Sequence, residues 1–301
     1  MSARRRLMGT TIVGLSALSA FLIIAVVVFV MATIVIGGKD TLTWEFLTTA
    51  PKAGMTEGGI FPAIVGTALL VIIMSIAGVP VGTVTAIYLS EYASSRSLLA
   101  RAVRFAVNTL AGVPAIVFGL FGLGFFVQFV GSGLDGAFTP AGEIRWAQPN
   151  ILWASLTMAL LTLPVVIVSV EEAIKTVPQD LRAASLALGA TKWQTIWKVV
   201  LPNSMTGIMT GGILAVSRGA GEVAPILFTG AAYFLPHLPG SLSDQFMELG
   251  YHVYIMSTQS TNVDATIGIQ FATTLVLLLL TFLLNFTAIF LRSRVRARQV
   301  Q

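Results

Sequence analysis

Residues 178–202 read PQDLRAASLALGATKWQTIWKVVLP, and this pattern predicts two short helices joined at a glycine. Pro178 suits the first position of a helix, where its missing N–H leaves no hydrogen bond unmade. Leu181, Ala184 and Leu188 follow at the spacing i, i+3, i+7, which puts them on one apolar stripe. Gly189 is expected to end this helix, because glycine adopts the left-handed cap conformation without strain.

The second helix of this stretch is expected to begin with a capping box, Thr191-Lys192-Trp193-Gln194. Its apolar face combines two tryptophans with two branched aliphatic residues: Trp193, Ile196, Trp197 and Val200. Tryptophan is favoured where a membrane meets water. The residues alone leave two interpretations open: an interfacial helix pair that only bridges two membrane spans, or a docking element for a cytoplasmic partner.

The chain on both sides of this stretch is too apolar for a soluble protein. It is 55% hydrophobic and 10% charged, with a mean hydropathy of +0.87, whereas soluble domains carry about a quarter charged residues. A helix needs roughly 20 apolar residues to cross a bilayer, and six stretches provide them: about 11–36, 60–89, 107–130, 151–170, 204–230 and 267–291. We therefore expect an all-α polytopic membrane protein, with an N-terminal segment 1–10, a single transmembrane domain 11–301 and a connecting loop 171–203.

Prolines and glycines inside these stretches predict how the helices bend and pack. Kinks are expected at Pro80, Pro114 and Pro164. Small-residue pairs, which let helices approach closely, are Gly78/Gly82 and Gly207/Gly211.

The distribution of positive charge predicts the orientation. Of 18 Lys and Arg residues, three lie before residue 11, three in the loop 90–106, four in the loop 171–203 and four after residue 291. The opposite loops hold three. Cytoplasmic loops carry the excess of Lys and Arg, so both termini are expected in the cytoplasm. This placement also explains the net charge of +5 without nucleic acid; the basic tail Arg292–Arg298 is expected to anchor the topology, with membrane lipid contact as the alternative.

Arg218 and Glu222 are the only charged residues inside the predicted spans. Their spacing of four predicts a shared helix face. A charge at the bilayer centre costs about 2.5–3.5 kcal/mol, so both should face the bundle interior or a water-filled path. Two interpretations remain: an ion pair that fixes helix packing, or an anion path in which Arg218 attracts an oxyanion as a forked donor and Glu222 orients or gates it.

The loop 171–203 resembles the EAA loop of ABC-importer permeases, in which a glycine separates two helices and I-x-L-P follows after nine residues. Here Gly189 precedes Val199-Val-Leu-Pro202 by nine residues. The chain departs from the pattern at Ala183, where the family has Glu. The resemblance implies that residues 178–189 form the helix that couples the permease to its ATPase, with Pro178, Leu181, Ala184, Leu188 and Gly189 as the coupling residues.

Three further runs resemble the PstA-type permeases of phosphate-specific ABC importers: Arg218–Thr229 (RGAGEVAPILFT), Gly78–Tyr92 and Gly112–Leu123. Val223 stands where that family has Thr. The match extends over about residues 60–300 and implies an all-α permease that translocates phosphate past Arg218 and Glu222. The implied partners are a homologous PstC-type permease, two copies of a PstB-type ATPase and a PstS-type binding protein, which would face the outer loop 231–266.

The remaining residues argue against several classes of function. The chain has no Gly-Lys-Ser/Thr phosphate loop, so ATP hydrolysis is expected on a separate subunit and the chain is not expected to be an enzyme. It has no cysteine, and His237 and His252 stand without a ligand cluster, so neither a cofactor nor a metal is predicted. The alternatives are an ABC permease for another oxyanion or small solute, a stand-alone secondary transporter or channel, and a membrane-embedded enzyme.

Overall fold

The structure of the chain, a computed structural model, describes residues 3–94, 96–140, 142–260 and 263–299. Six helical stretches in these residues are long and apolar enough to cross a membrane: Met8–Gly38, Phe61–Tyr92, Ala115–Phe138, Ile151–Lys175, Lys192–Gly219 and Val263–Val295. The predicted all-α fold with six spans is confirmed. Residues 1–2 and 300–301, which end the two predicted cytoplasmic termini, lie outside the described residues.

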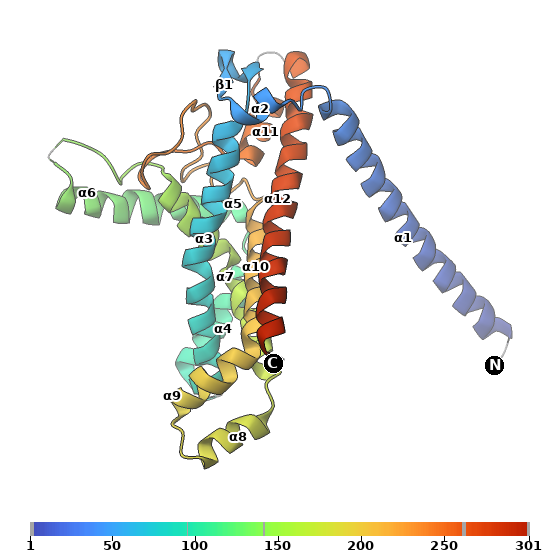
Figure 1. The fold of residues 1–301 in the computed structure, drawn as a ribbon, viewed down its shortest axis with the longest axis vertical. Helices are drawn as coiled ribbons and strands as arrows, with labels where there is room; N and C mark the ends of the chain where they lie inside the picture. The colour runs from blue at the N-terminus through green and yellow to red at the C-terminus, as the bar shows by residue number, and fades with distance from the viewer. Residues whose placement is uncertain (1–2, 95, 141, 261–262, 300–301) are drawn as a thin grey trace.

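Four long helices lie side by side and form the centre of the molecule (Figure 1). They are α3 (Phe61–Ile87), α7 (Ile151–Lys175), α10 (Leu201–Gly219) and α12 (Val263–Gln299). Helix α7 is the most deeply buried and packs against both α3 and α10. Helix α1 (Ala3–Gly38) leans away from this bundle (Figure 1) and is exposed along its apolar length. An apolar surface of this kind requires lipid or another protein against it.

Glycines allow the central helices to touch. Gly82 of α3 lies against Val166 of α7, where an added Cβ would be 2.6 Å from the Val166 Cγ1 atom. Gly207 of α10 lies against Ala173 of α7 and has no room for a side chain either. The predicted close approach at these small residues is confirmed, and it supports the dispersion contacts that hold helices together in lipid.

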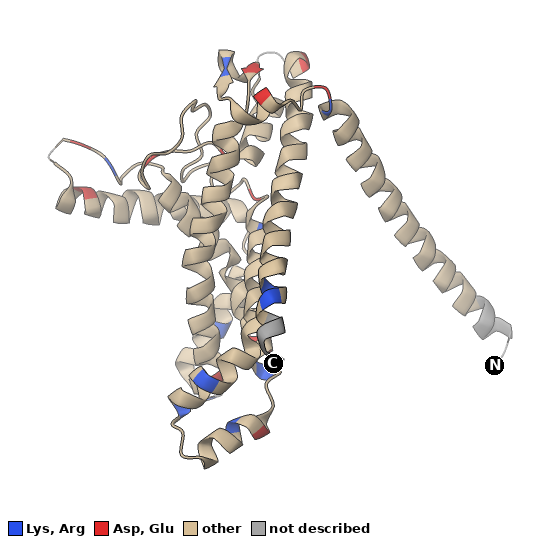
Figure 2. Ribbon diagram, viewed as in Figure 1, with Lys and Arg blue, Asp and Glu red and all other residues tan. Residues whose placement is uncertain are grey.

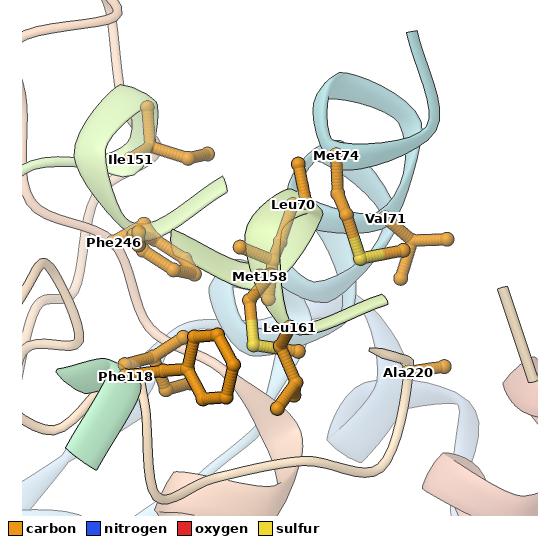
Figure 3. Close-up of a cluster of buried hydrophobic side chains, with 12 residues drawn as sticks. Leu70, Val71, Met74, Phe118, Ile151, Met158, Leu161, Ala220 and Phe246 are labelled. Carbon is orange, nitrogen blue, oxygen red and sulfur yellow. The ribbon is translucent and has the colours of Figure 1, made fainter. Parts of the chain in front are cut away.

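The core of the bundle joins α3 and α7 to the irregular segment before α11 (Figure 3). Leu70 and Met74 come from α3, Met158 and Leu161 from α7, and Phe246 from the irregular chain before α11. All five are nearly inaccessible to solvent. The packing therefore fixes the irregular segment on the helices.

The predicted single helix at 107–130 is broken in the structure. The helix α4 (Leu98–Leu110) and a turn at 111–114 precede the third span, which consists of α5 (Ala115–Gly122), the π-helix η3 (Leu123–Gly131) and α6 (Ser132–Phe138). Pro114 stands before α5 and does not kink a continuous helix. A proline disfavours the helical conformation at the preceding residue, here Val113, so the chain breaks there. Pro80 and Pro164 lie inside α3 and α7, where kinks were predicted.

The fifth span ends earlier than the predicted residue 230. Helix α10 stops at Gly219, and residues 220–230 form successive turns. Glycine weakens a helix and Pro225 cannot donate a backbone hydrogen bond, which explains the break. Gly219 lies against the side chain of Met74, near the middle of the span Phe61–Tyr92. The helix α10 therefore reaches only about halfway across the bundle.

The two ends of the bundle carry short elements. One end holds α2 (Trp44–Thr48), α11 (Leu249–Thr258) and a small hairpin of β1 (Pro51–Lys52), the 3-10 turn η1 (Ala53–Met55) and β2 (Glu57–Gly58). The opposite end holds α8 (Gln179–Ala187), α9 (Lys192–Thr195) and the π-helices η2 (Tyr88–Tyr92) and η4 (Ile196–Val200). Figure 2 shows Lys and Arg gathered near the α8 end.

Candidate functional site

The loop between α7 and α10 forms two helices that are capped by their own residues. The helix α8 begins next to Pro178, close to the predicted start. Pro178 is the N-cap of the helix, whereas the prediction made it the first helical residue. At the other end Gly189 has φ 85°. The N–H of Ala190 bonds to the carbonyl of Ser185, and the N–H of Gly189 to that of Leu186. These two bonds form a Schellman motif, which satisfies the last carbonyls of the helix.

Helix α9 begins with the predicted capping box. The Gln194 N–H donates to Thr191 Oγ1, and the Thr191 N–H donates to Gln194 Oε1 at 2.8 Å. The hydroxyls of Ser185 and Thr195 lie 2.9 Å apart and join α8 to α9. The two helices therefore form one unit that continues into α10.

The apolar stripe predicted on α8 has no cover in the protomer. Leu181, Ala184 and Leu188 are all exposed, Leu188 to 89%. Figure 1 shows α8 at the extreme end of the molecule, beyond the long helices. Ala183, at the position where the EAA pattern has Glu, is also exposed. A stripe of this kind at the tip of the molecule is typical of a surface that a partner covers.

The predicted apolar face of the second helix divides into two parts. Ile196 and Val200 are buried in the bundle, whereas Trp193 and Trp197 are exposed and stack on each other with ring centroids 5.6 Å apart. The tryptophans border an apolar groove beside the end of α3. This placement agrees with an interfacial position for the two rings.

Arg218 lies in the last turn of α10, at the helix end near the middle of the bundle. Its side chain is exposed in the protomer. The carbonyls at a helix C-terminus carry partial negative charge, which favours a cation there. An arginine this deep in a membrane requires water, an anion or another protein against it.

Glu222 does not share a helix face with Arg218, contrary to the prediction, because α10 ends between them. It lies in the following turn and is half-buried. Among the residues that the structure describes, neither Arg218 nor Glu222 takes part in an ion pair. The structure therefore does not contain the self-paired bridge that was one of the two interpretations.

Glu248 is a functional candidate that the sequence did not reveal. It is buried at the start of α11 and accepts hydrogen bonds from the N–H groups of Gly250 at 2.9 Å and Tyr251 at 2.7 Å. Burial raises the pKa of the Glu248 carboxyl to about 7, although these N–H groups act in the opposite direction. Val223, of the turn after α10, lies beside Gly250. This carboxyl thus belongs to the same neighbourhood as the segment 220–230.

The two histidines differ in their exposure to solvent. His237 is exposed in the irregular segment, whereas His252 is buried in α11 and burial lowers its pKa to about 4. Within the described ranges, no group of three or more His, Cys, Asp or Glu residues has the arrangement of a metal site.

A cluster of ion pairs near α8 was also missed. Arg182 of α8 pairs with Glu91 of η2 at 3.0 Å, and Arg104 of α4 pairs with Glu171 of α7 at 2.5 Å. From the sequence, the two arginines were counted only as positive charges of loops predicted to be cytoplasmic. No local signal could have paired residues that are 91 and 67 positions apart.

Comparisons with known proteins agree with this architecture. Residues 78–297 match the protein family described as the binding-protein-dependent transport system inner membrane component. A probable ABC transporter permease protein, YqgI of Bacillus subtilis (strain 168), is 31% identical and the alignment covers 84% of each chain. The phosphate transport system permease protein PstA of Mycobacterium leprae (strain TN) is 33% identical over 75% of this chain and 70% of its own length.

A solved structure supports the fold. A chain of the bacterial alginate ABC transporter aligns with a TM-score of 0.63 and 17% identity, over 90% of this chain and 92% of that one. The family match extends over most of the chain and includes the last part of α3 and all of α7, α8 and α10. The protein therefore belongs to the family of binding-protein-dependent transport system inner membrane components, and it is a multi-pass ABC permease of the PstA type and not an enzyme.

Proposed function

We propose that this chain is the permease subunit of an ATP-driven importer that translocates inorganic phosphate across the cytoplasmic membrane. The observation that carries the proposal is Arg218. It lies exposed at the end of a helix that stops near the middle of the bundle, within a run that resembles PstA-type permeases. The names of relatives such as PstA of Mycobacterium leprae support phosphate as the substrate.

The chemistry of Arg218 suits an oxyanion that must bind and leave. Its guanidinium offers a planar fork of N–H donors that matches phosphate oxygens. The partial negative charge of the α10 C-terminus and the nearby Glu222 weaken the hold on an anion. Phosphate is then stabilised enough to enter the bundle without being trapped there.

The exposed surfaces of the protomer suit three further subunits. A homologous PstC-type permease would cover Arg218 and complete the path. A pair of PstB-type ATPases would receive α8, with Leu181, Ala184 and Leu188 as the apolar contact and with Pro178 and Gly189 setting the ends of the helix. A PstS-type binding protein would deliver phosphate to the end that carries α2 and α11.

The cationic end of the bundle would face the cytoplasm. Lys and Arg near α8 (Figure 2) support this orientation. Both termini would then be cytoplasmic, and ATP-driven movement of α8 would open the path to alternate sides of the membrane.

The two alternatives predict other behaviour. A permease for another oxyanion or small solute would use the same α8 and would differ in the anion that competes for uptake. A stand-alone secondary transporter would have no use for the exposed apolar stripe on α8.

Uptake of radiolabelled phosphate at low micromolar concentration tests the proposal. Cells that lack the gene would receive the wild type, Arg218→Gln or Glu222→Gln, with Arg294→Gln as a matched control. Arg294 lies over the ring of Phe290 at the far end of α12, away from the proposed path. We expect wild type and Arg294→Gln to restore uptake and Arg218→Gln to reduce it at least tenfold, a loss of about 1.4 kcal/mol.

Membrane levels and subunit assembly would be measured in parallel. Uptake that wild type does not restore, or that excess sulfate suppresses while phosphate does not, would contradict the assignment of phosphate. Normal uptake by Arg218→Gln would show that this residue lies outside the path.

A further inference from the structure

Several elements converge on a polar cavity at the α8 end of the bundle. The π-helix η2, the C-terminal turns of α7 and the first turns of α8 surround a space of about 390 Å³, and α4 adds one side chain, Arg104. Five charged side chains line it: Glu91, Arg104, Glu171, Lys175 and Arg182. The π-helix η2 and α7 belong to transmembrane spans, whereas α8 is the exposed helix. The cavity is therefore a junction between α8 and the membrane-embedded part of the chain.

Arg182 joins η2, α7 and α8 with one guanidinium. Its Nε and Nη2 donate to Glu91 Oε1 at 3.2 and 3.0 Å. The same Nη2 donates to the carbonyl of Ile174 at 2.9 Å, and Nη1 donates to the carbonyl of Val177. The side chains of Arg182 and Glu91 are each only 12% exposed. A largely buried pair with this many hydrogen bonds holds a fixed geometry, unlike an exposed pair.

Glu91 is itself held in place from the other side. It lies in the π-helical turn that ends the span of α3. Arg104 of α4 donates to the carbonyl of Leu89 in that turn at 3.0 Å and pairs with the buried Glu171 of α7. Turns of the π type depart from regular helix geometry and are found at functional positions. The acceptor of Arg182 is thus braced by the rest of the bundle.

Helix α8 has one other side-chain hydrogen bond within the described residues. Ser185 contacts Thr195, which leads through η4 into α10. The bond of Ser185 therefore follows the covalent path into α10, whereas the bonds of Arg182 lead to α3 and α7. Lys192 of α9 also lies over the ring of Tyr92 in η2. Within the described part of the chain, Arg182–Glu91 is the one ion pair that α8 itself forms with η2, at the end of α3.

We propose that the Arg182–Glu91 pair is the positioning link that transmits movement of α8 to α3 during transport. The proposal rests on the proposed function, in which α8 docks on the ATPase. A pull on α8 reaches α7 and α10 along the chain and reaches η2, at the end of α3, through this pair, so the three helices move together. Loss of the pair lets α8 move while α3 stays, and ATP hydrolysis then continues with little transport.

The test uses the complete importer in proteoliposomes and measures phosphate transported for each ATP hydrolysed. Arg182→Gln and Glu91→Gln are each expected to lower this ratio at least tenfold, while ATPase binding and the hydrolysis rate stay within twofold of wild type. The double variant should be no worse than either single variant, because both remove the same link. Glu172→Gln is the matched control, since Glu172 forms only an exposed pair with Lys175 on the same turn of α7.

A covalent replacement separates a mechanical link from a general effect on folding. The chain has no cysteine, so Glu91→Cys combined with Arg182→Cys places the only two thiols of this subunit at the junction. We expect a low ratio in the reduced double-cysteine importer, recovery to within threefold of wild type with a short cleavable cross-linker, and loss again on reduction.

The outcomes distinguish this proposal from the proposed function. If wild type transports phosphate and single variants keep the ratio within twofold, or the cross-link restores nothing, the link is refuted and the proposed function stands. Multiplied losses in the double glutamine variant would also refute it. If the wild-type importer binds no ATPase or carries no phosphate, the proposed function fails, and this proposal fails with it.

Discussion

Glu248 should make the stability of the α11 end of the molecule depend on pH. Its carboxyl is buried, caps α11 through Gly250 and Tyr251, and lies 3.4 Å from the hydroxyl of Thr67 in α3. Burial raises its pKa from an ordinary 4.5 to about 7. The folded state therefore holds a proton on this group at pH values where the unfolded chain has already released it.

The direction of the effect follows from that difference. The neutral carboxyl favours the folded state below pH 4.5, and this contribution is lost as the pH rises through about 7. The full difference is worth about 3 kcal/mol, because each pKa unit corresponds to about 1.4 kcal/mol. Between pH 5 and pH 8 the free energy of unfolding should fall by about 2–3 kcal/mol through this group.

The measurement is reversible unfolding of the purified permease in mixed detergent micelles, followed by tryptophan fluorescence at pH 5 and pH 8. Glu248→Gln keeps one of the two oxygens that accept from Gly250 and Tyr251 and cannot ionise, so it should lose most of this pH dependence. Glu45→Gln, at the exposed start of α2, is the matched control and should keep it. An equal pH dependence in wild type and Glu248→Gln would refute the reasoning, because some other group would then carry it.

Two further predictions concern α8 and the helix contacts. Leu188→Glu puts a charge on the exposed apolar stripe of α8 and should reduce co-purification of the ATPase at least tenfold. The permease itself should remain monodisperse in detergent. The control Lys198→Gln, an exposed change on η4, should leave ATPase binding unchanged. Gly207→Leu inserts a side chain where α10 touches Ala173 of α7 and should destabilise the bundle by about 1–3 kcal/mol. The control Gly9→Leu places its side chain in open space and should not destabilise the bundle. Equal thermal stability of the two variants would contradict the close packing at Gly207.

The sequence predicted the parts of the fold that local signals determine. Six apolar stretches were enough for six spans because the length of a membrane helix is set by bilayer thickness. The capping box at Thr191 and the left-handed Gly189 were predictable for a similar reason, since a cap involves residues within one turn of each other. The resemblance of residues 218–229 to a known family then indicated a function for Arg218.

Hydropathy did not reveal where helices break inside the membrane. The segment 220–230 is as apolar as a helix, but it forms turns that the surrounding helices bury. Irregular backbone at this depth is tolerated where protein covers it, so its composition need not be polar. The same limit explains the break before α5. Pairings such as Arg182–Glu91 depend on the arrangement of whole helices and leave no trace in either local sequence.

A continuous helical segment connects Arg218 to the end of the molecule that carries the Arg182–Glu91 pair. Lys192–Gly219 runs without interruption from α9 through η4 and α10, and at about 1.5 Å per residue it is roughly 40 Å long. One end carries the unit that contains α8, and the other end carries Arg218. Movement of this segment at α8 therefore reaches Arg218 along the backbone, whereas it reaches α3 through side-chain contacts, among them Arg182–Glu91. Under the proposed link, the relative position of Met74 and Gly219, where the two helices touch near the middle of the bundle, would depend on that ion pair.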